Sequence, residues 1–282
     1  MKLVSFWYDD GPEIGALIDG DRIVPLTVLA ADMIDLIEDW EALKSEATEL
    51  VQAAADTVPL AEVQLLAPIP RPGKIMAIGL NYADHIAETG METPSHQIWF
   101  SKQANAVNGP FDPVEIPRVS QFVDYEAEMV AIIGSGGRHI SRDDAPAAVF
   151  GYCVGNDVSE RVWQMRTSQW VLGKSFDTHA PFGPWITTAD EVDNPHALGI
   201  RSYVNGEIRQ DSNTRHLVFD VWDQLAELSK VMTLEAGDVI FTGTPGGVGQ
   251  AMKPPRRLQA GDTVRIEIDK LGAIENPFAA EG

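Results

Sequence analysis

The stretch DYEAEMVAIIG at residues 124–134 carries two acidic side chains into an apolar run. The apolar half, MVAII, is typical of a buried β-strand. Side chains on a strand alternate between its faces, so Glu126 and Glu128 are expected on one face, about 7 Å apart. Two carboxylates that face the inside of a β domain would repel each other, and a hard divalent cation would relieve that repulsion. The alternative is an edge strand with two solvated glutamates, and this stretch alone leaves both interpretations open.

Outward from this run, strand-like segments outnumber helical ones. Further strands are predicted at 148–155, 200–204, 237–243 and 262–268. Helical stretches are predicted at 83–89, 158–170 and 218–230. The turn dipeptides NG at 205–206 and DG at 19–20 also indicate β-structure. The pattern favours a β-rich α+β protein over a doubly wound sheet.

The N-terminal part of the chain has its own pattern. Residues 1–30 alternate short apolar runs with Gly/Asp turns and predict two or three strands, whereas residues 31–56 have helical spacing. The segment LAPIPRPG at 66–73 contains three prolines and a glycine, which is typical of a boundary. We therefore predict a small N-terminal α+β domain at 1–66 and a main domain at 67–282.

Composition excludes several classes of protein. The 282 residues carry a formal net charge of −21, which repels nucleic acids and anionic membrane surfaces. No apolar stretch approaches the roughly 20 residues that span a bilayer, and no signal peptide is evident, so we expect a cytoplasmic protein. The single cysteine, Cys153, lies in an apolar run and is expected to be a buried hydrophobic residue. An anionic substrate would need local positive charge or a metal ion.

A polar cluster, GNDVS at 155–159, follows the apolar stretch VFGYCVG. Polar residues at the end of a buried strand are typical of functional sites, but Asp157 and Glu160 also fit a helix capping box. In the helix expected after them, Arg161 and Gln164 lie on one face.

Two glycine-containing turns are also candidates for anion binding. The segment GKSFD at 173–177 is not a P-loop, because residue 168 is serine where that motif needs glycine. Lys174 could stabilise an anion or lie on the surface. The loop TGTPGGVG at 242–249 could present backbone N–H groups to a carboxylate or phosphate, or be a structural turn.

A histidine and a glutamate lie one helical turn apart, at His85 and Glu88. A histidine oriented by a glutamate is a plausible general base, although such a pair on an exposed helix is more often a surface feature. The remaining histidines show no zinc-binding spacing.

Six segments in a fixed order resemble the fumarylacetoacetate hydrolase family. They are GLNYADHIAE, DYEAEMVAIIG, GYCVGNDVSERVWQ, GKSFDTHAPFGPW, GDVIFTGTPGGVG and LQAGDTVRIEIDKLGAIEN, and they extend from about residue 73 to 277. The stretch QWVLGKSFDTHAPFGPW is similar to the branch that contains acylpyruvate and diketo-sugar-acid hydrolases.

The resemblance implies a mixed, β-roll-like catalytic domain in an α+β homodimer that binds Mg²⁺ or Mn²⁺. It implies that His85 and Glu88 form a catalytic dyad on a mobile lid and that Lys174 lies near the metal. The implied metal ligands are Glu126, Glu128 and Asp157. The implied substrate contacts are Arg161, Gln164 and Thr244, the last in a loop that holds the substrate carboxylate.

The resemblance predicts a hydrolase that cleaves a C–C bond in a 2,4-dioxo acid, a chemistry of aromatic catabolism. The substrate would be an acylpyruvate, such as fumarylpyruvate or maleylpyruvate, or a 2,4-diketo-3-deoxy sugar acid. In this mechanism His85, oriented by Glu88, activates water, and Lys174 stabilises developing negative charge. The alternatives are an oxaloacetate-type decarboxylase and an isomerase or hydratase of an oxo-dienoate. A non-catalytic binding protein is disfavoured, because every implied position carries a competent residue.

Overall fold

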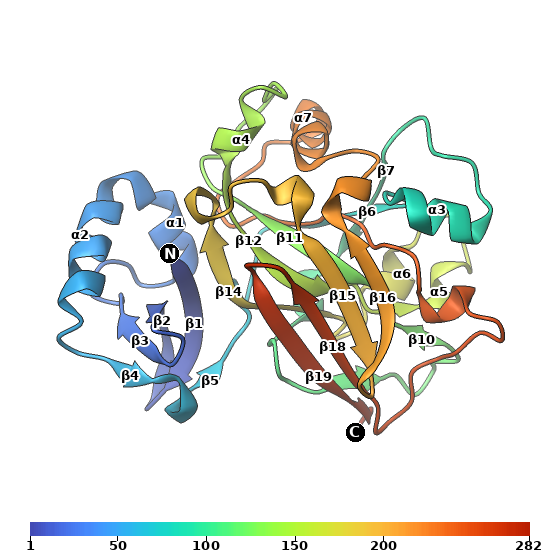
Figure 1. Cartoon of the computed structure of the whole chain (residues 1–282), viewed down its shortest axis with the longest axis horizontal. Coiled ribbons are helices and arrows are strands. Elements are labelled where there is room, and N and C mark those ends of the chain that lie inside the picture. Colours follow the sequence, from blue (N-terminus) through green and yellow to red (C-terminus); the bar gives the residue numbers. More distant parts are fainter.

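The computed structural model describes residues 1–282, and its N-terminal part is an antiparallel meander covered by two helices (Figure 1). The elements are β1 (Lys2–Tyr8), β2 (Gly11–Ile18), β3 (Arg22–Pro25), α1 (Met33–Glu38), α2 (Trp40–Ala53) and β4 (Val58–Pro59). Asp32 begins α1 by accepting hydrogen bonds from the backbone N–H groups of Ile34 and Asp35. The strands predicted at 1–30 and the helical segment at 31–56 are confirmed.

A large mixed sheet runs through the molecule. Beyond the N-terminal strands it contains β6 (Ile75–Gly79), β7 (Ile98–Lys102), β11 (Ala127–Ile133), β12 (Val149–Asn156), β14 (Ala180–Thr188) and β17 (Val239–Phe241). The order is β4-β3-β2-β1-β14-β12-β11-β17-β6-β7, and along it only the β17–β6 pair is parallel. Two short strands lie off this path: β5 (Gln64–Leu65) pairs with β1, and β8 (Val107–Asn108) pairs with β14.

The pairing of β1 with β14 joins the N-terminal meander to this sheet. The residues in register are Lys2 with Thr187 and Leu3 with Ile186. The predicted boundary between residues 66 and 67 follows β5 and stays a prediction. The hydrogen-bonded sheet continues across the two proposed parts.

A second, five-stranded sheet packs on the first. Its order is β16 (Glu207–Asn213), β15 (Gly199–Val204), β18 (Thr263–Ile268), β19 (Gly272–Ala280) and β9 (Val114–Ile116). Figure 1 shows β15, β16, β18 and β19 side by side in front of the β11–β12 pair. The core between the two sheets includes Met129 and Ala131 of β11 with Ile266 of β18 and Ile274 of β19. The sheet-rich α+β class predicted from the sequence is confirmed.

Strand β11 is buried on both faces. Ala127, Met129 and Ala131 belong to the core between the sheets. The residues between them, Val130 and Ile132, belong to a second core that also contains Cys153, fully buried as expected. Glu126 and Glu128 share the alternation of Val130 and Ile132, so the edge-strand alternative for this stretch is wrong.

The remaining strands and α-helices are short apart from one helix. They are α3 (Ala83–Thr89), β10 (Val123–Asp124), α4 (Ala145–Ala148), β13 (Ser159–Glu160), α5 (Arg161–Gln164), α6 (Val171–Lys174) and α7 (Val221–Val231). The predicted helices at 83–89 and 218–230 are confirmed by α3 and α7. None of the helices combines the length and the apolar character that a bilayer crossing requires.

The helix predicted at 158–170 is wrong in its extent. Residues 159–160 form β13, and α5 contains only one turn before α6 begins at Val171. The polar run RTSQW at 166–170 offers no apolar face to continue α5. The chain instead brings α6 directly against α5, since a Cβ at Gly173 would lie 2.2 Å from the backbone nitrogen of Gln164.

Candidate active site

A cavity of about 410 Å³ lies beside the ends of β6, β7 and β11 and is bordered by α3, α5 and α6. Figure 1 shows these three helices on the same side of the molecule. Eight of the nine residues predicted for the site line this cavity: His85, Glu88, Glu126, Glu128, Arg161, Gln164, Lys174 and Thr244. The ninth, Asp157, is fully buried and forms ion pairs with Lys174 and Lys102.

Three buried carboxylates meet at the base of the cavity. Glu126, Glu128 and Asp157 each offer an oxygen, and these oxygens lie within 4.8 Å of one another. The antiparallel pairing of β11 and β12 explains the meeting: Ala127 is in register with Asn156, so Glu126 and Asp157 flank that pair. A backbone hydrogen bond from the Asp157 N–H to the Glu126 carbonyl, 3.0 Å long, continues the register.

Two buried lysines accompany the carboxylates. The Lys174 ammonium donates to Glu126 Oε2 at 2.7 Å and to Asp157 Oδ2 at 2.6 Å. The Lys102 ammonium donates to Asp157 Oδ1 at 2.5 Å and to the Val158 carbonyl at 3.2 Å. Lys174 is therefore not a surface lysine, and Asp157 does not cap a helix: Glu160 itself accepts the N–H of Trp163 at the start of α5.

Sequence reasoning missed Lys102. The residue ends β7, IWFSK, where a lysine follows a largely apolar strand. That pattern was a usable signal, because a lysine is almost never fully buried unless it is paired. Its partner lies 55 residues away, and only the folded arrangement of the sheet brings the two together.

Electrostatics distinguishes the carboxylates. Burial, followed by repulsion from Asp157 and Glu126, raises the pKa of Glu128 well above its usual value. Burial opposes ionisation of Glu126 as well, but Lys174 and Arg161 outweigh it and hold the pKa of Glu126 low. Glu128 has no cation of its own, and only the Gly243 N–H donates to it, at 2.7 Å.

These residues fit a divalent metal ion. Three carboxylate oxygens form a hard donor set of the kind that Mg²⁺ and Mn²⁺ prefer. Repulsion among buried carboxylates is the condition that a bound cation relieves.

Arg161 is held by acidic residues as well as lining the cavity. Its guanidinium donates to Asp124 Oδ2 at 2.8 and 3.0 Å and to Glu126 Oε1 at 2.6 Å. It also donates to Gln164 Oε1 at 3.1 Å, as the spacing on one helical face predicted. The guanidinium thus fixes Glu126, and the substrate-contact role implied for Arg161 and Gln164 stays a prediction.

The His–Glu pair is formed and anchored. His85 Nδ1 lies 3.0 Å from Glu88 Oε1, and Glu88 Oε2 accepts the Gly247 N–H at 2.8 Å. The other ring nitrogen of His85, Nε2, has no hydrogen-bond partner in the protein. Helix α3 therefore contacts the loop at 242–249, for which the sequence left both anion binding and a structural turn open.

Thr244 lies in the same loop and lines the cavity. Its hydroxyl accepts a hydrogen bond from the side chain of Gln210, 2.8 Å away. Gln210 also accepts the backbone N–H of Ala127, which links the loop to β11.

Comparison with known proteins places this geometry in a family. The sequence model for the fumarylacetoacetate (FAA) hydrolase C-terminal domain matches residues 74–279. The mitochondrial oxaloacetate tautomerase fahd2 of Xenopus laevis is 45% identical over 286 residues, covering 98% of this chain and 90% of that protein. The human mitochondrial oxaloacetate tautomerase FAHD2A is 43% identical, covering 98% and 91%.

Solved structures match this chain over its full length. The maleylpyruvate hydrolase of Sphingobium sp. SYK-6, crystallised with manganese(II) and pyruvate, is 37% identical with a TM-score of 0.85, and each chain is covered completely. A fumarylacetoacetate hydrolase from Exiguobacterium antarcticum is 37% identical with a TM-score of 0.86, also at full coverage of both chains. The resemblance predicted from the six motifs is confirmed: the chain belongs to the fumarylacetoacetate hydrolase family.

Proposed function

We propose that this chain is a divalent-metal-dependent enzyme that interconverts the enol and keto forms of oxaloacetate. The observation that carries the proposal is one cavity lined by both a His–Glu pair and carboxylates of the acidic triad. The names of the relatives that are 43–45% identical over almost the whole chain support this substrate. It is a small anionic 2-oxo acid, the class of partner expected from the sequence.

Glu126, Glu128 and Asp157 would hold the metal, Mg²⁺ or Mn²⁺. When bound, such an ion polarises a substrate oxygen and offsets the negative charge of a dicarboxylate. Manganese(II) was present with pyruvate in the maleylpyruvate hydrolase structure, which supports the choice of metal class.

The residues of the chain account for the proton transfers. Ketonisation removes a proton from the enol oxygen and adds one at C3, so the atoms balance. Glu88 engages His85 Nδ1 and leaves Nε2 free to exchange a proton with the substrate. The buried Lys174 ammonium lines the cavity and would stabilise the negative charge that develops on the substrate oxygen.

Hydrolysis of an acylpyruvate is the second candidate. A cavity of about 410 Å³ with Phe100, Met165 and Trp170 in its wall offers more apolar surface than a four-carbon diacid needs. The likeness to a maleylpyruvate hydrolase supports the same choice. In that reaction His85 would take a proton from an attacking water instead of from the substrate.

A substrate panel separates the candidates. The loss of enol absorbance of oxaloacetate, the release of CO₂ from it, and the cleavage of several acylpyruvates are measured with the Mg²⁺- or Mn²⁺-loaded enzyme. We expect tautomerisation to have the highest kcat/KM. Higher kcat/KM for an acylpyruvate would replace the proposal with the hydrolase, and a dominant CO₂ signal would replace it with a decarboxylase.

The His85→Ala variant tests the role of the dyad. General-base losses are roughly 10²–10⁴-fold, and we expect a loss of that size in kcat. His96→Ala, a change at an exposed histidine outside the cavity, is the matched control and should keep wild-type activity. Activity within a few-fold of wild type in His85→Ala would show that the dyad does not move the proton.

A further inference from the structure

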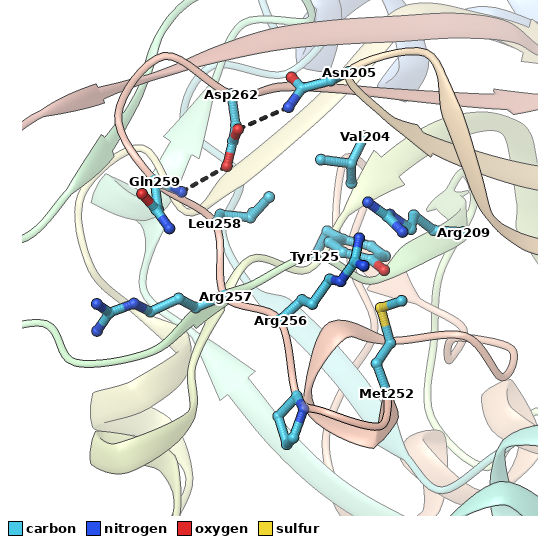
Figure 2. Close-up of a pocket in the computed structure, with 11 residues that line it drawn as sticks. Tyr125, Val204, Asn205, Arg209, Met252, Arg256, Arg257, Leu258, Gln259 and Asp262 are labelled. Carbon is cyan, nitrogen blue, oxygen red and sulfur yellow. Dashed lines mark hydrogen bonds between the residues drawn. The ribbon is translucent and has the colours of Figure 1, made fainter.

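A second cavity, of about 450 Å³, lies between the β15–β16 hairpin and residues 252–262 (Figure 2). It shares no lining residue with the candidate active site. Its polar wall carries the side chains of Arg209, Arg256 and Arg257. Its apolar wall includes the buried Val204 and Leu258. We name it the arginine pocket.

The positive charge in the arginine pocket is only partly matched. Arg209 and Arg256 approach the same carboxylate oxygen, Glu207 Oε2, at 2.8 and 3.9 Å. Figure 2 draws their guanidinium groups next to each other beside the ring of Tyr125. Two guanidinium groups therefore share a single carboxylate, that of Glu207. Glu207 is itself 65% exposed, so little packing fixes it there.

The other charged groups of the pocket do not neutralise this pair. Arg257 donates to the carbonyl oxygen of Gln121, an uncharged partner, at 2.9 Å. Asp262 accepts the side-chain amide of Asn205 at 2.8 Å and the backbone N–H of Gln259 at 2.7 Å. No ion pair joins Asp262 to any of the three arginines. A net positive site thus persists on a chain whose formal charge is −21.

From this arrangement we propose that the arginine pocket binds a small molecule that carries a phosphate monoester on an apolar body. A phosphate monoester has up to two negative charges and three acceptor oxygens, whereas Glu207 offers one charge. Its oxygens match the planar donor forks of two guanidinium groups. Met252 and Pro255, the less buried apolar residues of the pocket lining, would cover an apolar body. Because the whole chain repels anions, binding must come from these directed donors.

The pocket is connected to the candidate active site through hydrogen bonds. The Tyr125 hydroxyl donates to the Gly247 carbonyl at 2.8 Å, and the Gly247 N–H donates to Glu88 at 2.8 Å. The Arg256 backbone N–H donates to the Gly249 carbonyl at 2.9 Å. A ligand that contacts Tyr125 and Arg256 therefore touches two supports of the loop that holds Glu88.

Calorimetric titration of the Mg²⁺-loaded protein tests the proposal, with phenyl phosphate, inorganic phosphate and phenol as probes at constant ionic strength. We expect phenyl phosphate to bind more tightly than inorganic phosphate, and phenol not to bind. Arg209→Gln and Arg256→Gln should each weaken phenyl phosphate roughly tenfold, since each removes a charged hydrogen-bond donor. Glu207→Gln, which removes the competing carboxylate, should strengthen binding.

Arg265→Gln is the matched control. Arg265 lies on β18 outside the pocket and is half-exposed, and its loss changes the net charge by the same amount. The affinity of the Arg265→Gln variant for phenyl phosphate should stay within twofold of the wild-type affinity. If Arg265→Gln and Arg256→Gln weaken phenyl phosphate binding equally, the loss comes from the change in net charge alone, and the proposal is overturned.

Two further outcomes would also overturn it. One is the absence of phenyl phosphate binding at millimolar concentration. The other is binding that disappears when a chelator strips the metal, since this would place the phosphate at the metal site. Arg256 is half-exposed, so Arg256→Gln remains informative even if Arg209→Gln fails to fold.

Discussion

At the scale of single residues, partners decide what each carboxylate of the triad can do. Glu126 has two cationic partners, Arg161 and Lys174, and Asp157 has two lysines. Glu128 has a backbone N–H alone and the raised pKa that follows from burial beside its neighbours. The protein therefore offsets the ionised form of Glu128 least, and a bound cation would stabilise this carboxylate most.

Lys102→Met should destabilise the protein strongly. The change leaves Asp157 with one of its two ammonium partners, and removing one member of a buried ion pair costs about 3–5 kcal/mol. Urea unfolding of the metal-free protein measures this loss. Lys270→Met is the control, because its partner Asp193 is exposed, and exposed pairs contribute about 0–1 kcal/mol. A similar small effect for both variants would show that Lys102 is not needed to offset the charge of Asp157.

We expect the buried His179 to make the folded protein less stable in acid. Burial lowers its pKa to about 3, whereas the unfolded value is about 6.5. Between these values only the unfolded chain takes up the proton, so the free energy of unfolding falls as the pH falls from about 6.5 towards 3; above about 6.5 the residue is neutral in both states. His179→Gln removes this proton uptake and should flatten the slope by up to ~1.4 kcal/mol per pH unit.

Urea unfolding at several pH values measures that slope. His96→Gln, a change at an exposed histidine, should leave it unchanged. A slope in His179→Gln that equals the wild-type slope would mean that folding does not lower the pKa of His179.

At the scale of elements, patterns in neighbouring residues predicted single strands and helices but not the contacts between them. The apolar runs that become β11 and β12 are continuous in sequence, and Glu126 and Glu128 could be predicted as a pair because they precede the first run. Asp157, which follows the second run, was linked to them only through the family resemblance. Lys102 enters the site through the neighbouring pairs β17–β6 and β6–β7, which no local pattern indicates. The helix predicted at 158–170 failed for a similar reason. Tertiary packing between α5 and α6, with Gly173 against Gln164, replaces the regular continuation of α5.

Gly173→Ala tests that packing. A Cβ at this position would lie 2.2–2.6 Å from backbone and side-chain atoms of Gln164, so α6 must move away from α5. Lys174 moves with it, and its two hydrogen bonds to Glu126 and Asp157 should lengthen. We expect a loss of about 1–3 kcal/mol in stability and a fall in kcat. Gly11→Ala is the control, because a Cβ at this position would meet nothing within 4 Å, and it should keep the wild-type stability and kcat. If Gly173→Ala also keeps both values, the contact between α5 and α6 relaxes easily.

At the scale of the whole molecule, net charge acts on stability in two separable ways. A formal charge of −21 destabilises the folded state through general repulsion, which any salt screens. The buried triad adds a local repulsion that a monovalent salt relieves little, because buried charges are screened much less than exposed ones. Melting temperatures in different salts therefore distinguish the two contributions.

Mn²⁺ should raise the melting temperature of the metal-free protein above the value in KCl of equal ionic strength. A ligand at 100 times its Kd stabilises the folded state by about 2.7 kcal/mol, and this gain adds to general screening. In Glu128→Gln the melting temperatures in Mn²⁺ and in KCl should be equal. Without metal, this variant should be at least as stable as metal-free wild type, since the change relieves carboxylate repulsion. Glu46→Gln, at an exposed site on α2, should keep the difference. Equal melting temperatures of the wild type in Mn²⁺ and KCl would exclude the triad as a metal site.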